Sequence, residues 1–444
     1  RRHVRRPLSK AAGTPVVDEL GLGSFSRSQK GRIMKGKVAA FCRKYQEVLF
    51  WLGIGLALDV AFLMVKDAPL VADEGYHLPQ ISGFLSGNFE VSPHITVLPV
   101  YHAIMAGILK LIGAESVAEA RLVTFLGSAA SIWFFYLIVR RLWPEERYLR
   151  TAQFVFLPIL FPMHFLIYTD TWALAFVLIA LERGLAGRPW QSAAAITVAV
   201  LMRQPNLVWA GMIWILLVWK SDSLETTFEA IKSHWYRTTL PFVLVFAGFG
   251  GFILFNHGIA VGDRNQHEIG FNPANLWFFG LCFFIFFLPT CVGTLLRFWK
   301  PLRKNPIWAG AGFATGFSVF MATYHAAHQY NQASLWFYLR NRLLHWTSRI
   351  PAIKVLSFLP ALIGLTSFVL GPLRERRFHV LIPVSLASIA VMPLIEQRYY
   401  LVAFSMFLAF RRLENRSMER INTAAYALCS YVLLEEIAQN KFFL

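Results

Sequence analysis

Long apolar runs separated by short basic clusters are the feature that most limits how this chain can fold. Hydrophobic residues make up 56% of its 444 residues and charged residues only 15%, whereas soluble domains have about 45–50% apolar and about 25% charged residues. A globular core of this length cannot bury such an apolar excess, but a lipid bilayer can surround it. We therefore predict an all-α polytopic membrane protein, because helices satisfy their own backbone hydrogen bonds in lipid.

The apolar runs predict about thirteen membrane spans. They cover residues 48–65, 121–141, 150–168, 170–183, 191–202, 205–219, 239–256, 275–296, 306–324, 351–370, 378–394, 398–410 and 423–437. Several are shorter than the roughly 20 residues that a perpendicular helix needs to cross a bilayer. Short, broken helices are tolerated where they line a cavity, and the 191–219 region, interrupted at Arg203 to Asn206, is predicted to be such a place.

The net charge of +18 would favour a nucleic-acid partner in a soluble protein. Here the basic residues lie between apolar runs, which is the pattern that sets membrane topology. We therefore expect contact with membrane lipids and no nucleic-acid partner. Residues 1–47 are predicted to form a basic cytosolic tail and residues 48–444 a transmembrane domain. The four cysteines lack the spacing of metal ligands, so no metal is expected.

Residues 97–113 are apolar enough to span, but a span here would place Arg140, Arg141 and Arg150 outside, against the positive-inside rule. We therefore interpret 97–113 as a helix in the membrane interface, within a first non-cytosolic loop. With this choice the basic clusters become cytosolic. The opposite side then receives residues 66–120, 168–170, 203–206, 262–272, 325–349 and 396–400.

Two adjacent carboxylic acids, Asp73 and Glu74, follow the first predicted span, with His77 one turn further on. A carboxylate at a membrane surface can act as a general base toward a hydroxyl, since partial desolvation raises its pKa toward neutrality. The alternative is structural: Asp73 would be the N-cap of a helix over residues 74–86, which ends near Gly87. The sequence leaves both interpretations open, and they are compatible.

Two further segments on the same side carry charge. Arg203 lies between two apolar runs. It is either the partner of a phosphate or an arginine whose charged end reaches the membrane interface. The loop around Asp263, Arg264 and His267 is either part of a site or a solvated turn.

The last two segments lie toward the end of the chain. Arg340 and Arg342 put positive charge on the wrong side of the membrane, which an anionic ligand would stabilise, although the aromatic residues beside them also fit an interfacial belt. Glu396 and Arg398 stand at the start of a short predicted span. They are either binding residues or an ion pair that holds two helix ends together. The sequence has no Asp-x-Asp pair and no phosphate-cradling Gly loop, which argues for a donor carried by a lipid.

Together these motifs resemble the endoplasmic reticulum family of dolichyl-phosphate-glucose-dependent α-1,2-glucosyltransferases. The family segment Asp-Glu-x-x-His-x-x-Gln is similar to Asp73 to Gln80, and Tyr-Thr-Asp is similar to Tyr168 to Asp170. The family's Arg-Gln-Thr-Asn-Ile-Val-Trp, Gly-Asp-x-x-x-His and Arg-Tyr motifs resemble 203–209, 262–267 and 398–399. The resemblance covers roughly residues 45–420. The chain departs from the family pattern over 91–100, where an acidic residue, a basic residue and a proline are lost.

The resemblance implies a GT-C-like multi-helix bundle whose first luminal loop, 66–120, carries interfacial helices and the catalytic carboxylate. It implies inverting transfer of glucose from dolichyl-phosphate glucose to a dolichol-linked oligosaccharide, forming an α-1,2 linkage in the N-glycan precursor pathway, without a cofactor. The protein would be a multi-pass protein of the endoplasmic reticulum membrane, with a cytosolic N-terminus and a luminal active site. Asp73 is the predicted general base, with Glu74 as its competitor. The predicted substrate- and donor-binding residues are His77, Gln80, Asp170, Arg203, Gln204, Asn206, Asp263, Arg264, His267, Arg340, Arg342, Glu396, Arg398 and Tyr399.

Two other classes of function stay open. Another GT-C glycosyltransferase, with a lipid-phosphate mannose donor, would have the same kinds of residue. A transporter or channel-associated protein is a further alternative, because intramembrane charges also mark transport pathways. Against it, the chain has no second copy of the break at Arg203 and no internal repeat of the kind that transporters often contain.

Overall fold

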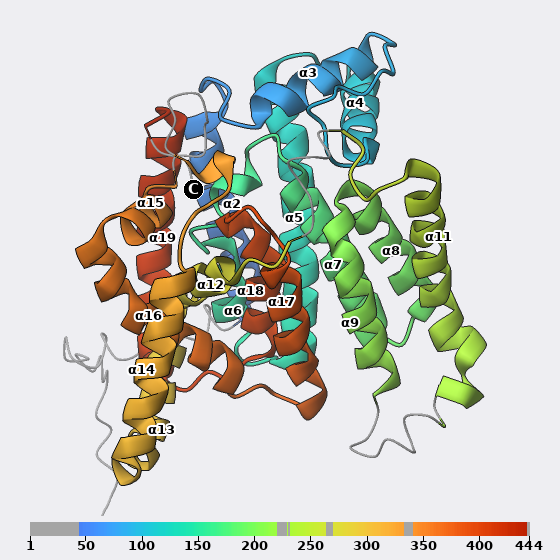
Figure 1. Ribbon diagram of the computed structural model, residues 1–444. Helices are drawn as coiled ribbons and strands as arrows, with labels where there is room; N and C mark the ends of the chain where they lie inside the picture. Colours follow the sequence, from blue (N-terminus) through green and yellow to red (C-terminus); the bar gives the residue numbers. More distant parts are fainter. Residues whose placement is uncertain (1–43, 220–228, 230, 263–269, 333–340, 442–444) are drawn as a thin grey trace, which may run out of the picture. The chain divides into compact units, whose positions relative to one another are not determined.

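The computed structural model describes residues 44–219, 229, 231–262, 270–332 and 341–441, and these residues are mainly helical (Figure 1). The helices of the first half are α2 (Gln46–Val65), α3 (Glu74–Leu85), α4 (Val100–Ile112), α5 (Val117–Leu142), α6 (Arg147–Val155), α7 (Thr169–Leu185), α8 (Pro189–Met202), α9 (Leu207–Val218) and α11 (Leu240–Asn256). Those of the second half are α12 (Pro273–Phe286), α13 (Leu288–Lys304), α14 (Pro306–Thr323), α15 (Arg342–Arg349), α16 (Pro351–Leu370), α17 (Leu381–Ala390), α18 (Leu401–Phe410) and α19 (Arg416–Ala438). The described residues divide into two compact units, 44–56 and 57–441, and α3 to α19 all belong to the second.

The predicted all-α membrane class is confirmed, because most of the apolar residues in the predicted spans lie on helices, although the run 150–168 is helical mainly up to Val155. Within the described residues, four helices are long and apolar enough to cross a membrane, namely α2, α5, α16 and the continuous stretch Trp235–Asn256. The pair α12 and α13, bent by 99°, makes a fifth if it counts as one span. Several of the other predicted spans are interrupted and form shorter helices, as in α8 and α9. The prediction of about thirteen spans is therefore not confirmed.

Local chemistry explains where several helices begin and end. Ser116 and Glu119 form a reciprocal capping box at the start of α5, which satisfies backbone N–H groups that have no partner within the helix. The predicted break at 203–206 is present: α8 ends at Met202, and the short η2 turn (Gln204–Asn206) precedes α9. Arg203 is extended and separates the two helices, and Pro205 lies at the start of the new turn, where its missing backbone N–H costs no hydrogen bond. The Asn206 side chain donates to the Ala199 carbonyl (3.1 Å), which satisfies the end of α8.

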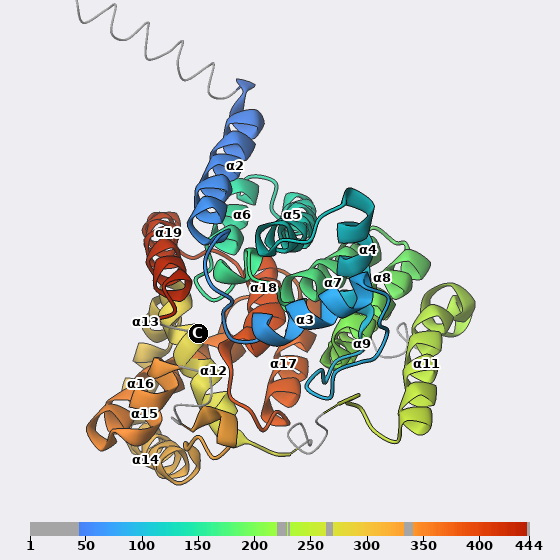
Figure 2. The same ribbon diagram turned by 90° about the horizontal axis from the view of Figure 1, so that it is seen from above.

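Helices α3 and α4 lie together at one end of the second unit (Figures 1 and 2). Their contact buries Ile81, Phe84, Tyr101 and Met105. The 13-residue α4 is about 20 Å long, which is shorter than the roughly 30 Å hydrocarbon core of a bilayer. The sequence interpretation of 97–113 as a helix that does not span is consistent with this length, and its position in the interface stays a prediction.

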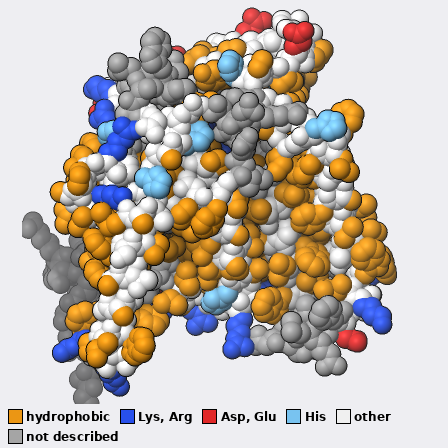
Figure 3. Space-filling view, in the orientation of Figure 1, with side chains coloured by type: hydrophobic (Ala, Val, Ile, Leu, Met, Phe, Trp, Pro, Cys, Tyr) orange, Lys and Arg blue, Asp and Glu red, His pale blue; other side chains and the backbone are white. Residues whose placement is uncertain are grey.

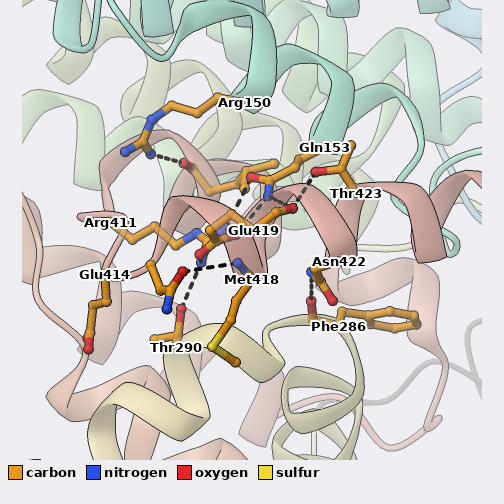
Figure 4. A network of polar contacts seen from close by, with 12 residues as sticks. Arg150, Gln153, Phe286, Thr290, Arg411, Glu414, Met418, Glu419, Asn422 and Thr423 are labelled. Carbon is orange, nitrogen blue, oxygen red and sulfur yellow. Dashed lines mark hydrogen bonds and ion pairs between the residues drawn. The ribbon is translucent and has the colours of Figure 1, made fainter.

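The two ends of the second unit differ in charge. Figure 3 shows hydrophobic side chains across the middle of the visible face, with Lys and Arg along the end opposite α3 and α4 and a smaller basic group nearer α3. At the far end Arg411 is fully buried and pairs with Glu419 (Nη1–Oε1 2.7 Å), while Gln153 and Thr290 accept hydrogen bonds from the same guanidinium (Figure 4). This network joins α6, α13 and α19 and keeps a buried charge paired, as burial requires.

Candidate active site

Four segments that are far apart in the sequence meet near the start of α3. Asp73 directly precedes α3, Asp170 is in the first turn of α7, and Arg203 follows α8. Arg398 lies in the short η7 turn (Gln397–Tyr400) before α18. Viewed from the α3 end, α3 lies over α7, α17 and α18 (Figure 2). The ion pairs among these residues define what we call the acid–arginine cluster: Asp73, Asp170, Arg203, Glu396 and Arg398.

Asp73 directs its carboxylate toward Arg398. Its Oδ2 atom lies 2.7 Å from Nη1 of Arg398, and its side chain is 31% exposed. Asp73 stands at the N-cap position of α3, as one interpretation of the sequence expected, but its side chain makes no capping hydrogen bond. The residue before it, Ala72, has a φ of 47°, a left-handed conformation that residues with a side chain rarely adopt. The turn therefore serves to present the Asp73 carboxylate to the cluster.

The surroundings of Asp73 keep it ionised. Burial favours the neutral acid and would raise the pKa of Asp73, but the positive charges of Arg398 and Arg203 and the hydrogen bond from Arg398 outweigh this effect and hold the pKa below its usual value. Asp73 is therefore a carboxylate at neutral pH, able to accept a proton. The rise of its pKa toward neutrality that the sequence predicted is wrong, because the neighbouring positive charges outweigh the desolvation.

The second acid of the cluster, Asp170, is shared by both arginines. Its Oδ2 atom lies 2.8 Å from Nη1 of Arg203 and 3.9 Å from Nη1 of Arg398. The Arg203 Nη1 also donates to the Thr169 hydroxyl (3.1 Å). Both guanidiniums lie near the ring of Tyr399, at 5.7 and 5.9 Å from its centroid. The two cations are thus held side by side with the planar, multi-donor geometry that suits a phosphate.

The neighbouring acid, Glu74, has a different environment. It is fully buried and forms a two-pronged ion pair with Arg121, at 3.0 Å from Nε and 2.5 Å from Nη2. Its two oxygens also accept the backbone N–H groups of Val71 (2.9 Å) and Ile167 (2.9 Å). Glu74 therefore ties α3 to α5 and to the segment before α7, and its oxygens are occupied by protein donors.

His77 pairs with another histidine. Its Nδ1 lies 2.9 Å from Nε2 of His102 in α4, and both rings are buried. Burial lowers the pKa of His77 to about 4, so the ring is neutral at neutral pH. The pair fastens α3 to α4 behind Asp73.

Three of the predicted binding residues hold loops in place. The Gln80 amide bridges the Glu90 carbonyl (2.9 Å) and the Ser92 N–H (2.7 Å). The Gln204 amide donates to the Thr96 carbonyl (3.3 Å) and the Ile259 carbonyl (3.2 Å). Together with the contact of Asn206 described above, these bonds fix the loops that surround the cluster.

A cavity of about 50 Å³ opens beside the two arginines. Asp170, Arg203, Arg398 and Tyr399 form its polar part. Its apolar walls come mainly from α7, α9 and α17, and they include Leu174, Trp209 and Ile389. A charged end joined to an apolar wall suits an amphiphile with an anionic head.

The predicted site residues are not all gathered here. Arg342, at the start of α15, is exposed, and its Nη2 donates to the Lys441 carbonyl (2.6 Å) instead. Asp263, Arg264, His267 and Arg340 lie outside the described residues, so their roles stay predictions. Within the described ranges, no group of three or more His, Cys, Asp or Glu side chains is placed to hold a metal ion.

Three residues beside the cluster were not among the predicted site residues, namely Arg121, His102 and Tyr168, although Tyr168 begins one of the family-like motifs. The Tyr168 hydroxyl accepts the Asp73 N–H (2.9 Å) and donates to the Val71 carbonyl (3.3 Å), and its ring lies 5.2 Å from the Arg398 guanidinium. Arg121 could have been found as a cation in the first turns of a predicted span, where a buried partner is needed. The sequence around His102 gives no comparable signal.

Comparison with known proteins identifies the family of the chain. A model of the DIE2/ALG10 family matches residues 68–234 and 219–409. A rat protein named Dol-P-Glc:Glc(2)Man(9)GlcNAc(2)-PP-Dol alpha-1,2-glucosyltransferase is 27% identical over 51% of this chain and 60% of its own length. Proteins with the same name from Homo sapiens and Debaryomyces hansenii are each 25% identical, over 81% and 89% of this chain and 88% and 94% of their own lengths. The chain thus spans 60% of the rat relative and most of the other two.

Among solved structures, ArnT from Cupriavidus metallidurans in the apo state is similar with a TM-score of 0.40 and 15% identity, over 90% of this chain and 78% of that chain. The family model covers most of the residues between 68 and 409, including every described member of the acid–arginine cluster. The chain therefore belongs to the DIE2/ALG10 family.

Proposed function

We propose that this protein transfers glucose from dolichyl-phosphate glucose to a dolichol-linked oligosaccharide, forming an α-1,2 linkage with inversion in the N-glycan precursor pathway. Membership of the DIE2/ALG10 family and the shared name of its relatives support this proposal. In this proposal the helices form a GT-C-like body around the cluster.

The observation that carries the proposal is the placement of the Asp73 carboxylate against Arg398, which lines a cavity together with Arg203. A base and two phosphate-binding cations are the groups that displacement at a sugar phosphate needs. Glu74 is a poor candidate for the base, because its oxygens already accept four protein donors.

The reaction is a single displacement. Asp73 takes the proton of the acceptor hydroxyl while that oxygen attacks the anomeric carbon from the face opposite the phosphate. The bond between the anomeric carbon and the phosphate oxygen breaks, and its electron pair leaves with the lipid phosphate. Arg203 and Arg398 stabilise the charge that develops there, which is often the largest contribution to catalysis. Asp73 later returns its proton to solvent.

The test is the substitution Asp73→Asn, with Glu90→Gln as a matched control, since Glu90 is an exposed carboxylate in the same loop. We expect Asp73→Asn to lower glucose transfer by about 10²–10⁴-fold, the usual contribution of a general base, and Glu90→Gln to leave it unchanged. Transfer is measured with labelled dolichyl-phosphate glucose and, in parallel, labelled dolichyl-phosphate mannose.

Each other result excludes a part of the proposal. Near-wild-type transfer by Asp73→Asn would contradict the assignment of the base. Transfer from the mannose donor alone would change the sugar, and transfer from neither donor would favour the transport alternative.

We further propose that the reaction needs no metal, because the donor carries one phosphate and the positive charges of Arg203 and Arg398 can neutralise it. Transfer is then expected to persist in an excess of chelator, measured against the same assay with added Mg²⁺ or Mn²⁺. Loss of activity in chelator, restored by one of these ions, would contradict this part.

The cellular placement is also a proposal: a multi-pass protein of the endoplasmic reticulum membrane, with its N-terminus in the cytosol and the acid–arginine cluster facing the lumen. The separation of the cluster from the basic end supports it, since Lys and Arg gather on the cytosolic side of membrane proteins (Figure 3).

A further inference from the structure

Glu396 is a buried carboxyl that the displacement mechanism does not use. Its residue is 1% exposed, and its Oε1 atom lies 2.6 Å from Nε of Arg398. This close contact does not have the direction of a hydrogen bond, and neither carboxyl oxygen has a hydrogen-bond partner among the described residues. A buried carboxyl without such partners is costly, and its retention beside the site calls for a functional explanation.

Arg398 is the cation that three carboxyls share. Its Nη1 faces Asp73 at 2.7 Å and Asp170 at 3.9 Å, while its Nε faces Glu396. Arg203 already serves Asp170 at 2.8 Å. With every group ionised, the cluster has three negative and two positive charges. Ionised Glu396 is therefore the excess charge, and it opposes the arrival of an anionic phosphate.

We propose that Glu396 is a positioning residue for Arg398. By attracting Nε of the guanidinium, it determines whether the Nη atoms stay with Asp73 or bind the donor phosphate. Ionised Glu396 keeps Arg398 among the three carboxyls. When Glu396 carries a proton, its pull on Nε is lost and the cluster is electrically balanced, so the Nη edge is free to turn to the phosphate. The inference rests on the proposed function, since it takes a lipid phosphate as the ligand and Asp73 as the base.

The titration of the cluster agrees with this role. Burial raises the pKa of Glu396 to about 7, and the charges of Asp73 and Asp170 add to the effect while Arg398 opposes it. The groups that face Glu396 or the rest of the cluster are Asp73, His77, Asp170, Arg203, Arg398, Tyr168 and Tyr399. The pKa of Asp73 lies below its usual value, and that of His77 is about 4. Glu396 is thus a carboxyl that changes charge near neutral pH.

The experiment measures binding of dolichyl-phosphate glucose to the purified full-length protein without acceptor. The donor is a phosphodiester, so it has no proton that titrates in the working range. In the wild type we expect affinity to fall by about fivefold as the pH rises from about 5.5 to about 8.5, because Glu396 ionises and adds a negative charge near the phosphate. In Glu396→Gln the affinity should stay constant over this range and match the wild-type value at the acid end.

Two further variants separate positioning from folding. Glu396→Asp keeps a titratable carboxyl and should retain the pH dependence of binding. Glu414→Gln removes a carboxylate from an ion pair with Arg297 at the far end and should bind as the wild type does at every pH. A merely structural role for Glu396 would lower the thermal midpoint without changing the pH dependence.

The inference is overturned if Glu396→Gln and the wild type show the same pH dependence, or if Glu396→Asp loses it as Gln does. Should Glu396→Gln not fold, wild-type affinity that is constant across the pH range still overturns it. Dolichyl-phosphate mannose serves as the second probe. If neither phosphodiester binds the wild type, the proposed function is contradicted. If the donor binds with an affinity that does not depend on pH, only the role of Glu396 is contradicted.

Discussion

At the scale of single residues, neighbouring acids of the same motif have opposite environments. Asp73 is part-exposed and faces Arg398, whereas Glu74 is fully buried against Arg121. The reason is geometric: successive residues at a helix start point in different directions, so the Glu74 side chain enters the packing between helices and the Asp73 side chain faces Arg398. The motif thus combines a reactive carboxylate with the anchor that fixes its position.

The anchor role of Glu74 predicts a stability effect. Glu74→Gln breaks a fully buried ion pair and leaves the Arg121 charge uncompensated, which costs about 3–5 kcal/mol. We expect a clear fall in the thermal unfolding midpoint of the purified protein in detergent. Asp73→Asn is the matched control, because its carboxyl is 31% exposed and its loss should change the midpoint little. A Glu74→Gln protein that is as stable as the wild type but inactive would instead assign the base to Glu74.

At the scale of helices, close packing depends on residues without a side chain. Helices α12 and α16 approach each other at Gly280 and Gly364, and a Cβ added at Gly364 would lie only 1.8 Å from the Gly280 carbonyl oxygen. Small residues allow this approach in membrane helices. Residue Asn275, one turn into α12, accepts a hydrogen bond from the Tyr400 hydroxyl, so this packing also supports η7, which carries Arg398.

This contact predicts that Gly364→Ala destabilises the protein by about 1–3 kcal/mol, the usual cost of overpacking. Gly312→Ala in α14 is the control, since an added methyl group there meets nothing within 4 Å. Thermal unfolding of the two variants in the same detergent should lower the midpoint for Gly364→Ala only. Equal midpoints would show that α12 and α16 can move apart without a loss of stability.

At the scale of the whole molecule, the proposed topology assigns the ends to different sides of the membrane. Asn415, Arg416 and Ser417 form an N-glycosylation sequon in the basic end, where the Asn415 side chain caps α19. The loop between α3 and α4 contains Asn88, and Glu90 stands two residues after it. Both of these residues are exposed.

The topology predicts that Asn415 carries no glycan in cells, because it would face the cytosol. Glu90→Thr completes a sequon at Asn88 and should add one glycan, since this loop would face the lumen. The measurement is the gel shift that is removed by an endoglycosidase. A glycan at Asn415, or its absence at Asn88 with a glycan elsewhere, would reverse the assigned sides.

The sequence by itself determined the membrane class, the approximate positions of many helices and the break at 203–206, because apolar runs and proline act through neighbouring residues. It also indicated the family, through short motifs in a fixed order. The number of spans did not follow from it, since apolar composition does not say whether a run is a straight helix or two short ones.

Only the tertiary structure decided how the charged residues are paired. It joined Asp73 to Arg398 and Arg203 to Asp170, placed Arg121 against Glu74, and left Arg342 at the Lys441 carbonyl. The physical reason is that a buried charge takes its partner from whichever helix packs against it, and packing joins residues far apart in the chain. The sequence showed that charges gather on one side, and the fold determined which of them form a site.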